Sequence, residues 1–336
     1  MKTLYTEGKY LLEPTGNRVI LRGINLPVLD DWDFPGSDKL AELEKSGANA
    51  VRIQWYQTYG SPERPPYHLS DLDDLLTRCR AAAMIPIVML ADLTCQPDIS
   101  LLNSQLIPWW TSEPVAGLLK KHGDYLIINL ANELGSYRWA GDDDAQQAAL
   151  AAFTGAYETA VTAVRNAAFK GPLMIDAPDC GTSINAITAV GQQLIEHDPE
   201  HNLLLSAHAY WAAYDGTSEL TVALEANLPI VFGEVANKQD EQVNGSTVYG
   251  YFDLDGAAES HPPPTGFSYQ SLLSTLQANG IGWLAWSWGP DACKERRISA
   301  DGDFSRLTRY GDDIVNNPTY GLKSTSVRVP APPLDV

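Results

Sequence analysis

The chain has 336 residues, 44% of them hydrophobic, which is enough to build a large core. Its 23 Lys and Arg residues against 42 Asp and Glu residues give a formal charge of −19. Such an acidic chain is unsuited to nucleic acids or anionic membranes, which require clustered Lys and Arg, and suits a neutral or cationic partner. No uncharged apolar run reaches the roughly 18 residues of a membrane span, and no signal-peptide pattern is present. We expect a secreted protein whose signal was removed, with a cytoplasmic location as the alternative.

A β-hairpin over Tyr10–Val19 is the first predicted element, with its turn at Thr15–Asn17. Eight short, largely apolar runs then predict strands at Val19–Asn25, Ala50–Tyr56, Ile85–Leu90, Leu126–Glu133, Pro172–Pro178, Leu203–Tyr210, Pro229–Val235 and Gly282–Trp288. Amphipathic segments between them predict helices, among them Asp71–Ala83, Ala145–Phe169, Ile184–Glu196, Thr217–Ala226 and Ser268–Ala278. This alternation predicts an α/β fold, a closed (β/α)8 barrel with the hairpin at its bottom. An open doubly wound sheet would instead carry a glycine-rich phosphate loop, and the sequence has none.

We expect a single (β/α)8 domain over residues 1–326, followed by a proline-rich tail or linker stub, Val327–Val336. The longest connection runs from Ala236 to about Gly266. Loops of this length in a compact domain are usually functional or mobile, so we expect this one to border the cleft at the barrel mouth.

Cysteine and histidine spacing argues against the common metal sites. Because no C-x-x-C motif occurs, the zinc-ribbon and thioredoxin interpretations fail. Of the six histidines only His208 ends a predicted strand, so the ligand cluster of a metal-dependent barrel hydrolase is missing. Buried free thiols are the first interpretation of the cysteines, and one disulfide is the alternative; the four residues are Cys79, Cys95, Cys180 and Cys293.

Active sites of such barrels lie at the C-terminal ends of the strands. Polar and aromatic residues lie at the ends of seven of the eight predicted strands, and Asp92 follows the remaining strand, Ile85–Leu90. These residues are Asn25, Arg52, Gln54, Tyr56, Asp92, Asn132, Glu133, Asp176, Asp179, His208, Tyr210, Glu234, Trp286 and Trp288. Glu133 and Glu234 stand out because each ends a strongly apolar strand, where an ionised side chain needs an interaction partner or has a functional role. They end strands four and seven of eight and should face each other across the barrel mouth. Two opposed carboxyl groups suit glycoside cleavage, in which one protonates the leaving oxygen and the other attacks the anomeric carbon or activates water.

The neighbouring strand ends supply groups that suit this chemistry. Arg52 could hold one carboxylate ionised, and His208 and Tyr210 could orient the pair. Trp286 offers a flat platform for a sugar ring. Further candidates for substrate contact are Trp288, Asn25, Asp92, Trp109 and Trp110, with packing as an equal alternative for the three tryptophans; we assign Asp176 and Asp179 to structure.

Six motifs resemble glycoside hydrolase family 5 enzymes. They are Gly8–Leu12 with Val19–Asn25, Ala48–Ile53, Ala131–Glu133, Ser206–Tyr210, Gly233–Glu234 and Trp283–Trp288, in this order on the expected strands. The resemblance implies a retaining enzyme without cofactors, in which Glu133 is the acid/base and Glu234 the nucleophile. It further implies that Asn132 binds the sugar 2-hydroxyl and Trp286 lines the −1 subsite, with Arg52, His208 and Tyr210 as the supporting shell.

The sequence departs from this family in two places. Many members carry a His at the end of the third strand, where this chain has Ala91, so the −1 subsite should differ. Leu134 follows the implied acid/base, where proline or an aromatic residue is more usual.

Our first expectation is a monomeric endo-β-1,4-glucanase that acts on a neutral polysaccharide, cellulose or mixed-linkage glucan. The alternative is an endo-β-1,4-mannanase, because the stretches Ser206–Tyr210 and Trp283–Trp288 look much like mannanases, although Ala91 counts against it. A non-enzyme alternative is a barrel that binds carbohydrate without cleaving it, which predicts the loss of a carboxylate, whereas both are present.

Overall fold

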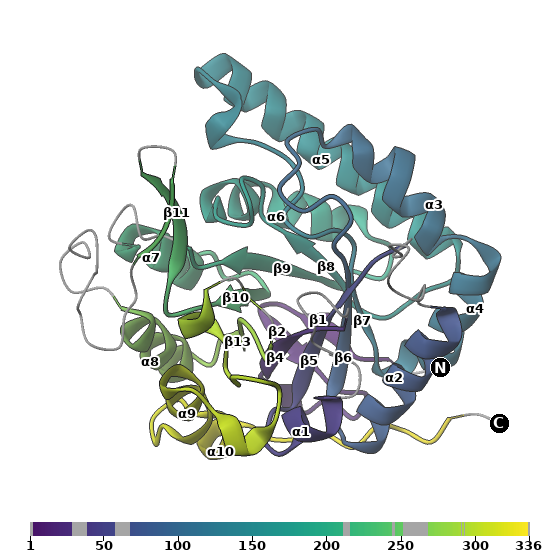
Figure 1. Cartoon of the computed structure of the whole chain (residues 1–336). Coiled ribbons are helices and arrows are strands. Elements are labelled where there is room, and N and C mark those ends of the chain that lie inside the picture. The colour runs from purple at the N-terminus through teal and green to yellow at the C-terminus, as the bar shows by residue number, and fades with distance from the viewer. Residues whose placement is uncertain are drawn as a thin grey trace, which may run out of the picture.

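The computed structural model describes residues 3–28, 39–57, 68–210, 216–243, 246–250, 268–289, 291 and 293–334, with side chains outside 239–250. Eight parallel strands close into a barrel in the order β10-β13-β4-β5-β6-β7-β8-β9 (Figure 1). Their bounds are β4 (Arg22–Pro27), β5 (Ala50–Trp55), β6 (Ile85–Leu90), β7 (Ile127–Asn129), β8 (Leu173–Asp176), β9 (Leu203–His208), β10 (Ile230–Val235) and β13 (Gly282–Ala285). The predicted (β/α)8 barrel is confirmed.

Helices cover the outside of the barrel: α1 (Leu40–Glu44), α2 (Leu69–Ala81), α3 (Ile107–Trp110), α4 (Glu113–His122), α5 (Asp143–Asn166), α6 (Ile184–His197), α7 (Thr217–Glu225), α8 (Tyr269–Asn279), α9 (Arg309–Asn316) and α10 (Leu322–Thr325). Helix α2 shows why, since Leu72, Leu75, Leu76 and Cys79 share one face and are buried against the strands. Helix α5 starts where the side chain of Asp142 accepts the backbone N–H of Ala145. The five helices predicted from periodicity therefore form close to their predicted bounds.

The barrel interior changes from apolar at its bottom to charged at its mouth. Along β5, Val51 and Ile53 pack outward against the helices, whereas Ala50 packs inside and Arg52 follows it two residues later. Strand β9 repeats this pattern with Leu204 inside the bottom and His208 at the mouth. Because side chains alternate between the two faces of a strand, the residues that point into the barrel are apolar at its bottom and ionisable at its mouth. The ionisable side chains thus lie on an apolar floor. That floor consists of Leu4, Leu11, Val19, Leu21, Ala50, Ile85, Ile87, Tyr125, Ile127, Met174, Leu204, Val231 and Leu284.

A small antiparallel sheet, β1 (Tyr5–Glu7), β2 (Tyr10–Leu12) and β3 (Arg18–Val19), contributes to this floor. The predicted hairpin is β2 and β3, whose turn is held by the Glu13 carboxylate through the backbone N–H groups of Thr15 and Asn17. Val19 pairs with Leu11 in this sheet, so the first barrel strand begins at Arg22 rather than at Val19 as expected.

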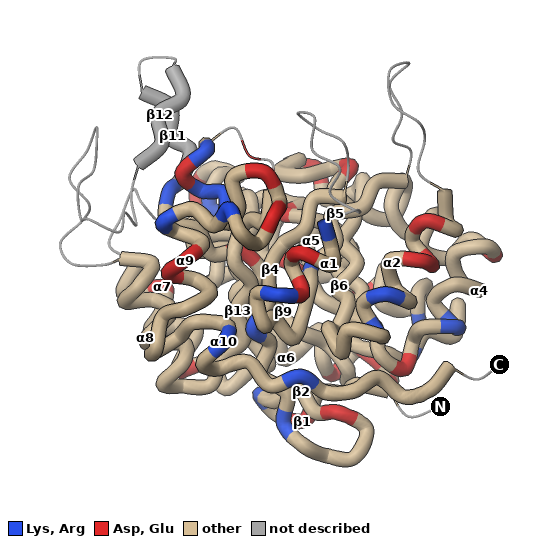
Figure 2. The backbone as a smooth tube through the Cα atoms, turned by 60° about the horizontal axis from the view of Figure 1, so that its bottom comes forward, with Lys and Arg blue, Asp and Glu red and all other residues tan. Residues whose placement is uncertain are grey.

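The proline-rich C-terminal segment, in its described part 327–334, lies across the same end of the barrel (Figure 2). Tyr125 donates to the carbonyl of Val329, Arg80 donates to the carbonyl of Pro332, and Val329 and Ala331 pack against the apolar floor. This part of the expected tail is therefore bound to the barrel bottom.

The long connection after β10 contains an antiparallel pair, β11 (Gln239–Val243) and β12 (Ser246–Gly250). Its remainder, residues 251–267, lies outside the described residues, so its place beside the cleft stays a prediction. Among the helices that the structure describes, none is both long and apolar enough to cross a membrane.

Candidate active site

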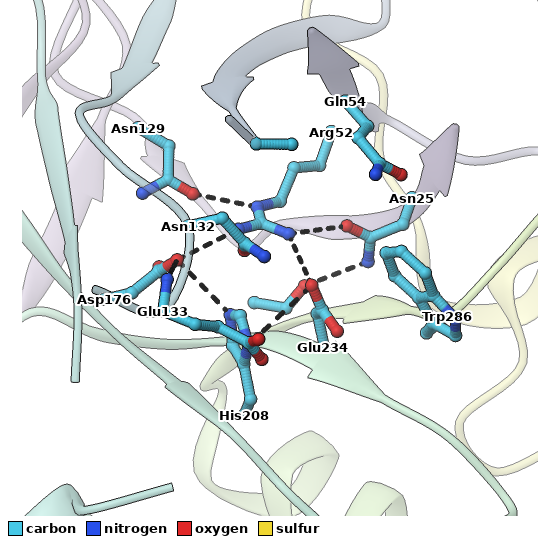
Figure 3. A network of polar contacts seen from close by, with 12 residues as sticks. Asn25, Arg52, Gln54, Asn129, Asn132, Glu133, Asp176, His208, Glu234 and Trp286 are labelled. Atoms are coloured by element: carbon cyan, nitrogen blue, oxygen red, sulfur yellow. Dashed lines mark hydrogen bonds and ion pairs between the residues drawn. The ribbon is translucent and has the colours of Figure 1, made fainter. Parts of the chain in front are cut away.

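A cavity of about 740 Å³ opens where the barrel strands end. Glu133 and Glu234 both line it, together with Tyr210 and Trp286 from the predicted set. One carboxylate oxygen of Glu133, one of Glu234 and a ring nitrogen of His208 lie within 4.8 Å of one another. The structure therefore brings together the two carboxyl groups that the sequence singled out (Figure 3).

Glu234, on β10, is held by two donors. Nη1 of Arg52 lies 2.8 Å from its Oε1, and the Tyr210 hydroxyl donates to its Oε2 at 2.9 Å. The Arg52 side chain is fully buried. A buried guanidinium and a phenol hydroxyl, each donating to a different oxygen, fix the position and orientation of this carboxylate. Glu234 is thus equipped to act as a nucleophile.

Glu133 has the opposite environment. It follows β7 with φ +55°, a left-handed conformation that is rare for a residue with a side chain. Nδ1 of His208 lies 2.6 Å from Oε1, and Sγ of Cys95 lies 3.1 Å from Oε2. Burial and the nearby charge of Glu234 raise the pKa of Glu133 to about 7, against the opposing effect of His208. A carboxyl group that stays protonated near neutrality can serve as a general acid.

Arg52 is the hub of the network (Figure 3). Besides Glu234, it donates to Asn25, Asn129, Asn132 and Asp176, so its guanidinium joins five strands or strand ends. Each N–H group of the guanidinium therefore has a hydrogen-bond acceptor, which a buried cation requires.

Asp176 is a member of the site rather than a remote structural residue. Its fully buried Oδ2 lies 3.0 Å from Nη2 of Arg52 and 3.6 Å from Nε2 of His208. Burial raises the pKa of Asp176, but the charges of Arg52 and His208 outweigh it and lower this pKa to about 2. Burial would lower the pKa of His208, but the charges of Glu234 and Asp176 raise it to about 10. His208 is therefore a cation set among three carboxyl groups.

Two glycines make room for the His208 ring. A Cβ on Gly181, which has φ +76°, would lie 2.5 Å from the ring, and a Cβ on Gly233 would lie 2.9 Å from Nε2. Because any side chain would collide there, both positions require glycine. The register shift of β10 falls at Gly233, immediately before Glu234.

Of the aromatic residues expected at the cleft, Tyr56, Tyr210 and Trp286 line the cavity. Trp286 lines the cavity, half-buried, and its indole N–H donates to Asp291 at 2.6 Å, which fixes the ring. Trp139, which the sequence analysis missed, also lines the cavity and is 61% exposed, with the guanidinium of Arg138 5.4 Å from its ring centre. Trp139 lies in a short helical turn where no apolar periodicity points to it.

Five further residues expected to contact substrate do not line the cavity. Trp288 and Trp110 are fully buried and donate to the carbonyls of Gly302 and Leu130, so neither has a free face for a sugar. Trp109 packs edge-to-face on Trp110 on α3. The other two are polar: Asp92 accepts the backbone N–H of Gln57, and the fully buried Asn25 donates to the carbonyl of Gly233. The three tryptophans therefore have the packing role that was the alternative expectation.

Of the two expectations for the cysteines, the structure supports the alternative of one disulfide, and the first, buried free thiols, holds for the other two cysteines only. Cys79 and Cys293 are buried free thiols. Cys95 and Cys180 form a disulfide, and both line the cavity. Their separation of 85 residues gives no sequence signal for the pairing.

Two groups of side chains among the described residues are close enough to hold a metal ion: Cys95, Glu133 and Cys180, and Glu133, His208 and Glu234. The sulfurs of the first group are bonded to each other and are not thiolates, which are the metal-binding form. In the second group, Glu234 already accepts from Arg52 and Tyr210, and His208 carries a proton at the pH of most enzymes. The donor chemistry therefore favours proton transfer over metal binding.

Two carboxyl groups in contrasting environments at the mouth of a (β/α)8 barrel define a glycoside hydrolase. The family model described as cellulase (glycosyl hydrolase family 5) matches residues 12–292, so the chain belongs to glycoside hydrolase family 5.

Several similar proteins are named mannan endo-1,4-beta-mannosidase, and another is named beta-mannanase/endoglucanase A. The one from Cellvibrio japonicus is 27% identical over 96% of this chain and 67% of its own length. The one from Salipaludibacillus agaradhaerens is 25% identical over 96% of this chain and 93% of its own length. The solved β-mannanase of Thermomonospora fusca has the same fold, with a TM-score of 0.77 and 23% identity over 98% of both chains, and has also been solved with mannohexaose.

Proposed function

We propose that this protein is a retaining endo-β-1,4-mannanase in which Glu133 is the acid/base and Glu234 the nucleophile. The observation that carries the reaction type is the close approach of the two carboxylates, within 4.8 Å. Retaining glycosidases keep their carboxyl groups about 5–5.5 Å apart, whereas inverting enzymes need roughly 6.5–9.5 Å to admit a water molecule. The substrate is inferred from the activity of the similar proteins.

The proposed reaction has two steps. Glu234 attacks the anomeric carbon while Glu133 gives its proton to the glycosidic oxygen, so the bond to the leaving sugar breaks and a glycosyl ester forms. Glu133, now a carboxylate, then takes a proton from water, whose oxygen displaces Glu234 from the same carbon. Arg52 and Tyr210 hold the nucleophile, and His208 orients the acid/base.

A β-1,4-glucanase is the second candidate, and it was the first expectation from the sequence. The family model favours it by its description as cellulase, and Ala91 at the cavity wall favours it because mannanases of this type usually carry a His there. The similar proteins favour the mannanase over this reading.

The test is the release of reducing sugar from galactomannan, glucomannan, carboxymethyl cellulose and barley mixed-linkage glucan in parallel, with Glu234→Ala as the control. Cleavage of galactomannan supports the proposal. Cleavage of the glucans alone contradicts the proposal and supports a β-1,4-glucanase instead. Binding without cleavage of any polymer would indicate the inactive carbohydrate-binding barrel.

We propose that the protein works outside the cell. The disulfide supports this location, because such bonds persist in oxidising compartments and are rare in a reducing cytosol. Fractionation of a native host culture, followed by activity on galactomannan, tests it; activity confined to the cytosol would contradict the proposal.

A further inference from the structure

The Cys95–Cys180 disulfide spans the loop that carries Glu133. Cys95 follows β6 and Cys180 follows β8, the two strands that flank β7 in the barrel. Backbone bonds run the same way, because Gly135 donates to the carbonyl of Gln96 at 2.8 Å and Asp179 donates to the carbonyl of Gly135 at 3.0 Å. Three neighbouring loops are therefore fastened together around Glu133.

The bridge also faces the carboxyl group itself. His208 contacts Oε1 of Glu133, whereas the sulfur of Cys95 lies 3.1 Å from Oε2. A disulfide sulfur carries no hydrogen and cannot donate to a carboxylate. Cys95 is exposed on its outer side, whereas the Glu133 side chain against which its sulfur lies is only 8% exposed. The charged and titratable side chains that contact this carboxyl group or its neighbours, or line the same cavity, are Arg52 on β5, Tyr56 after β5, Arg138 after β7, Asp176 on β8, His208 on β9, Tyr210 after β9, Glu234 on β10 and Arg296 after β13.

We propose that the Cys95–Cys180 disulfide is a positioning element of the acid/base, which holds Glu133 towards the leaving group and denies its Oε2 both water and a hydrogen-bond donor. This inference rests on the proposed function, in which Glu133 is the acid/base. The bridge thereby keeps the carboxyl group protonated at a pH where an exposed glutamate would be ionised.

Reduction by a dithiol changes the chemistry at this point. The sulfur–sulfur bond takes up two electrons and two protons and becomes two thiols, while the dithiol is oxidised to its own disulfide. The new Cys95 thiol, close to Oε2, can donate to the carboxylate. Because a donor stabilises the ionised form, the pKa of Glu133 falls and the proton needed by the leaving group is lost at lower pH.

The experiment compares the oxidised enzyme, the enzyme reduced with dithiothreitol, and the double variant Cys95→Ala/Cys180→Ala. A thiol count in denaturant monitors reduction and should rise from two to four. The readout is the pH profile of kcat/KM on galactomannan and on 2,4-dinitrophenyl β-mannobioside, whose leaving group needs no proton. Cys79→Ala, on α2 and fully buried, is the matched control and should respond to dithiothreitol as the unmodified enzyme does.

We expect reduction to move the alkaline limb of the pH profile of kcat/KM, measured on galactomannan, to lower pH by about 0.5–1 unit. A pKa shift of this size corresponds to the free energy of about one hydrogen bond. The rate on galactomannan at pH 7 then falls about 2- to 5-fold, while the rate on the dinitrophenyl substrate stays nearly constant. The double variant should move the limb the same way, because water replaces the sulfur. If the double variant does not fold, the comparison of the oxidised and reduced native enzyme is the test. If dithiothreitol does not reduce the disulfide, the comparison of the native enzyme with the double variant is the test.

An unmoved limb would overturn the proposal, as would an equal loss on both substrates, since a purely structural role predicts the latter. Failure of the proposed function looks different, because the oxidised enzyme itself would then cleave none of these substrates.

Discussion

Nη1 of Arg52 lies 2.8 Å from Oε1 of Glu234, and Nη2 of the same guanidinium lies 3.0 Å from Asp176. One buried cation therefore serves two carboxylates that come from different strands. The charge of this guanidinium helps to lower the pKa of Asp176, although that side chain is fully buried.

Glu234→Ala should lower kcat by at least about three orders of magnitude and leave binding of oligosaccharides largely intact, because the nucleophile acts in bond formation. Added azide should restore turnover and yield the α-glycosyl azide, since the anion occupies the place of the lost carboxylate. Isothermal titration with manno-oligosaccharides and product analysis by NMR check both points. Full activity of this variant would disprove the assignment.

The kcat/KM of the native enzyme should fall as pH rises through about 7. Glu133 must be protonated to act, and burial with the charge of Glu234 raises its pKa to about 7, so the active form is lost above that pH. Glu133→Ala should abolish this limb, slow galactomannan hydrolysis severely, and affect 2,4-dinitrophenyl substrates much less in the glycosylation step. A limb that persists in the variant would belong to another group.

Asp176→Asn should lower the free energy of unfolding by about 3 kcal/mol at pH 7, because it removes one of the two carboxylates, Asp176 and Glu234, that face both Arg52 and His208. The folded-state pKa of Asp176 is about 2, below that of an unfolded aspartate, so its stabilisation is present above about pH 4 and is lost as pH falls towards 2. Urea unfolding at pH 7, 4 and 3 should therefore show a shrinking difference between the native enzyme and the variant. Asp98→Asn, at an exposed position, is the control and should change little.

Trp286→Ala and Trp288→Ala should separate binding from packing. Trp286 lines the cleft, so its loss should weaken transition-state binding by roughly 1–3 kcal/mol in kcat/KM with little change in melting temperature. Trp288 is fully buried, so its loss should cost about 3–5 kcal/mol of stability. Steady-state kinetics and thermal unfolding of both variants test these expectations. A stability loss for Trp286→Ala and a loss of kcat/KM alone for Trp288→Ala would contradict them.

Trp139→Ala should raise KM for long manno-oligosaccharides about 3- to 10-fold and leave cleavage of short aryl glycosides unchanged, because an exposed indole at the cleft is a platform for a distal sugar. The melting temperature should not move. Equal KM values for mannohexaose in both enzymes would show that no sugar rests on this ring.

Strand-end reasoning located the pair of carboxyl groups in the cleft, because parallel strands place their last residues at one end of the barrel. It also supplied Arg52, His208 and Tyr210, which the structure joins to that pair. These predictions needed only the order of the strands and their side-chain alternation.

The remaining features depend on contacts between distant segments. Trp288 and Trp286 lie two residues apart and are chemically alike, and only packing decides which one reaches the cleft. Asp176 ends an apolar strand as Glu133 does, but its place beneath His208 follows from the closure of the barrel. The glycines at 181 and 233 carry no local signal, because the constraint comes from a ring elsewhere in the chain.

Both ends of the described chain are fastened beside one another at the barrel floor. Leu4 donates to the carbonyl of Asp124, and the neighbouring Tyr125 donates to the carbonyl of Val329. The cleft opens at the opposite end, where the strands finish. A tether joined to either end, for immobilisation on a bead or fusion to another protein, would therefore leave the catalytic face turned outward and open to an insoluble polymer.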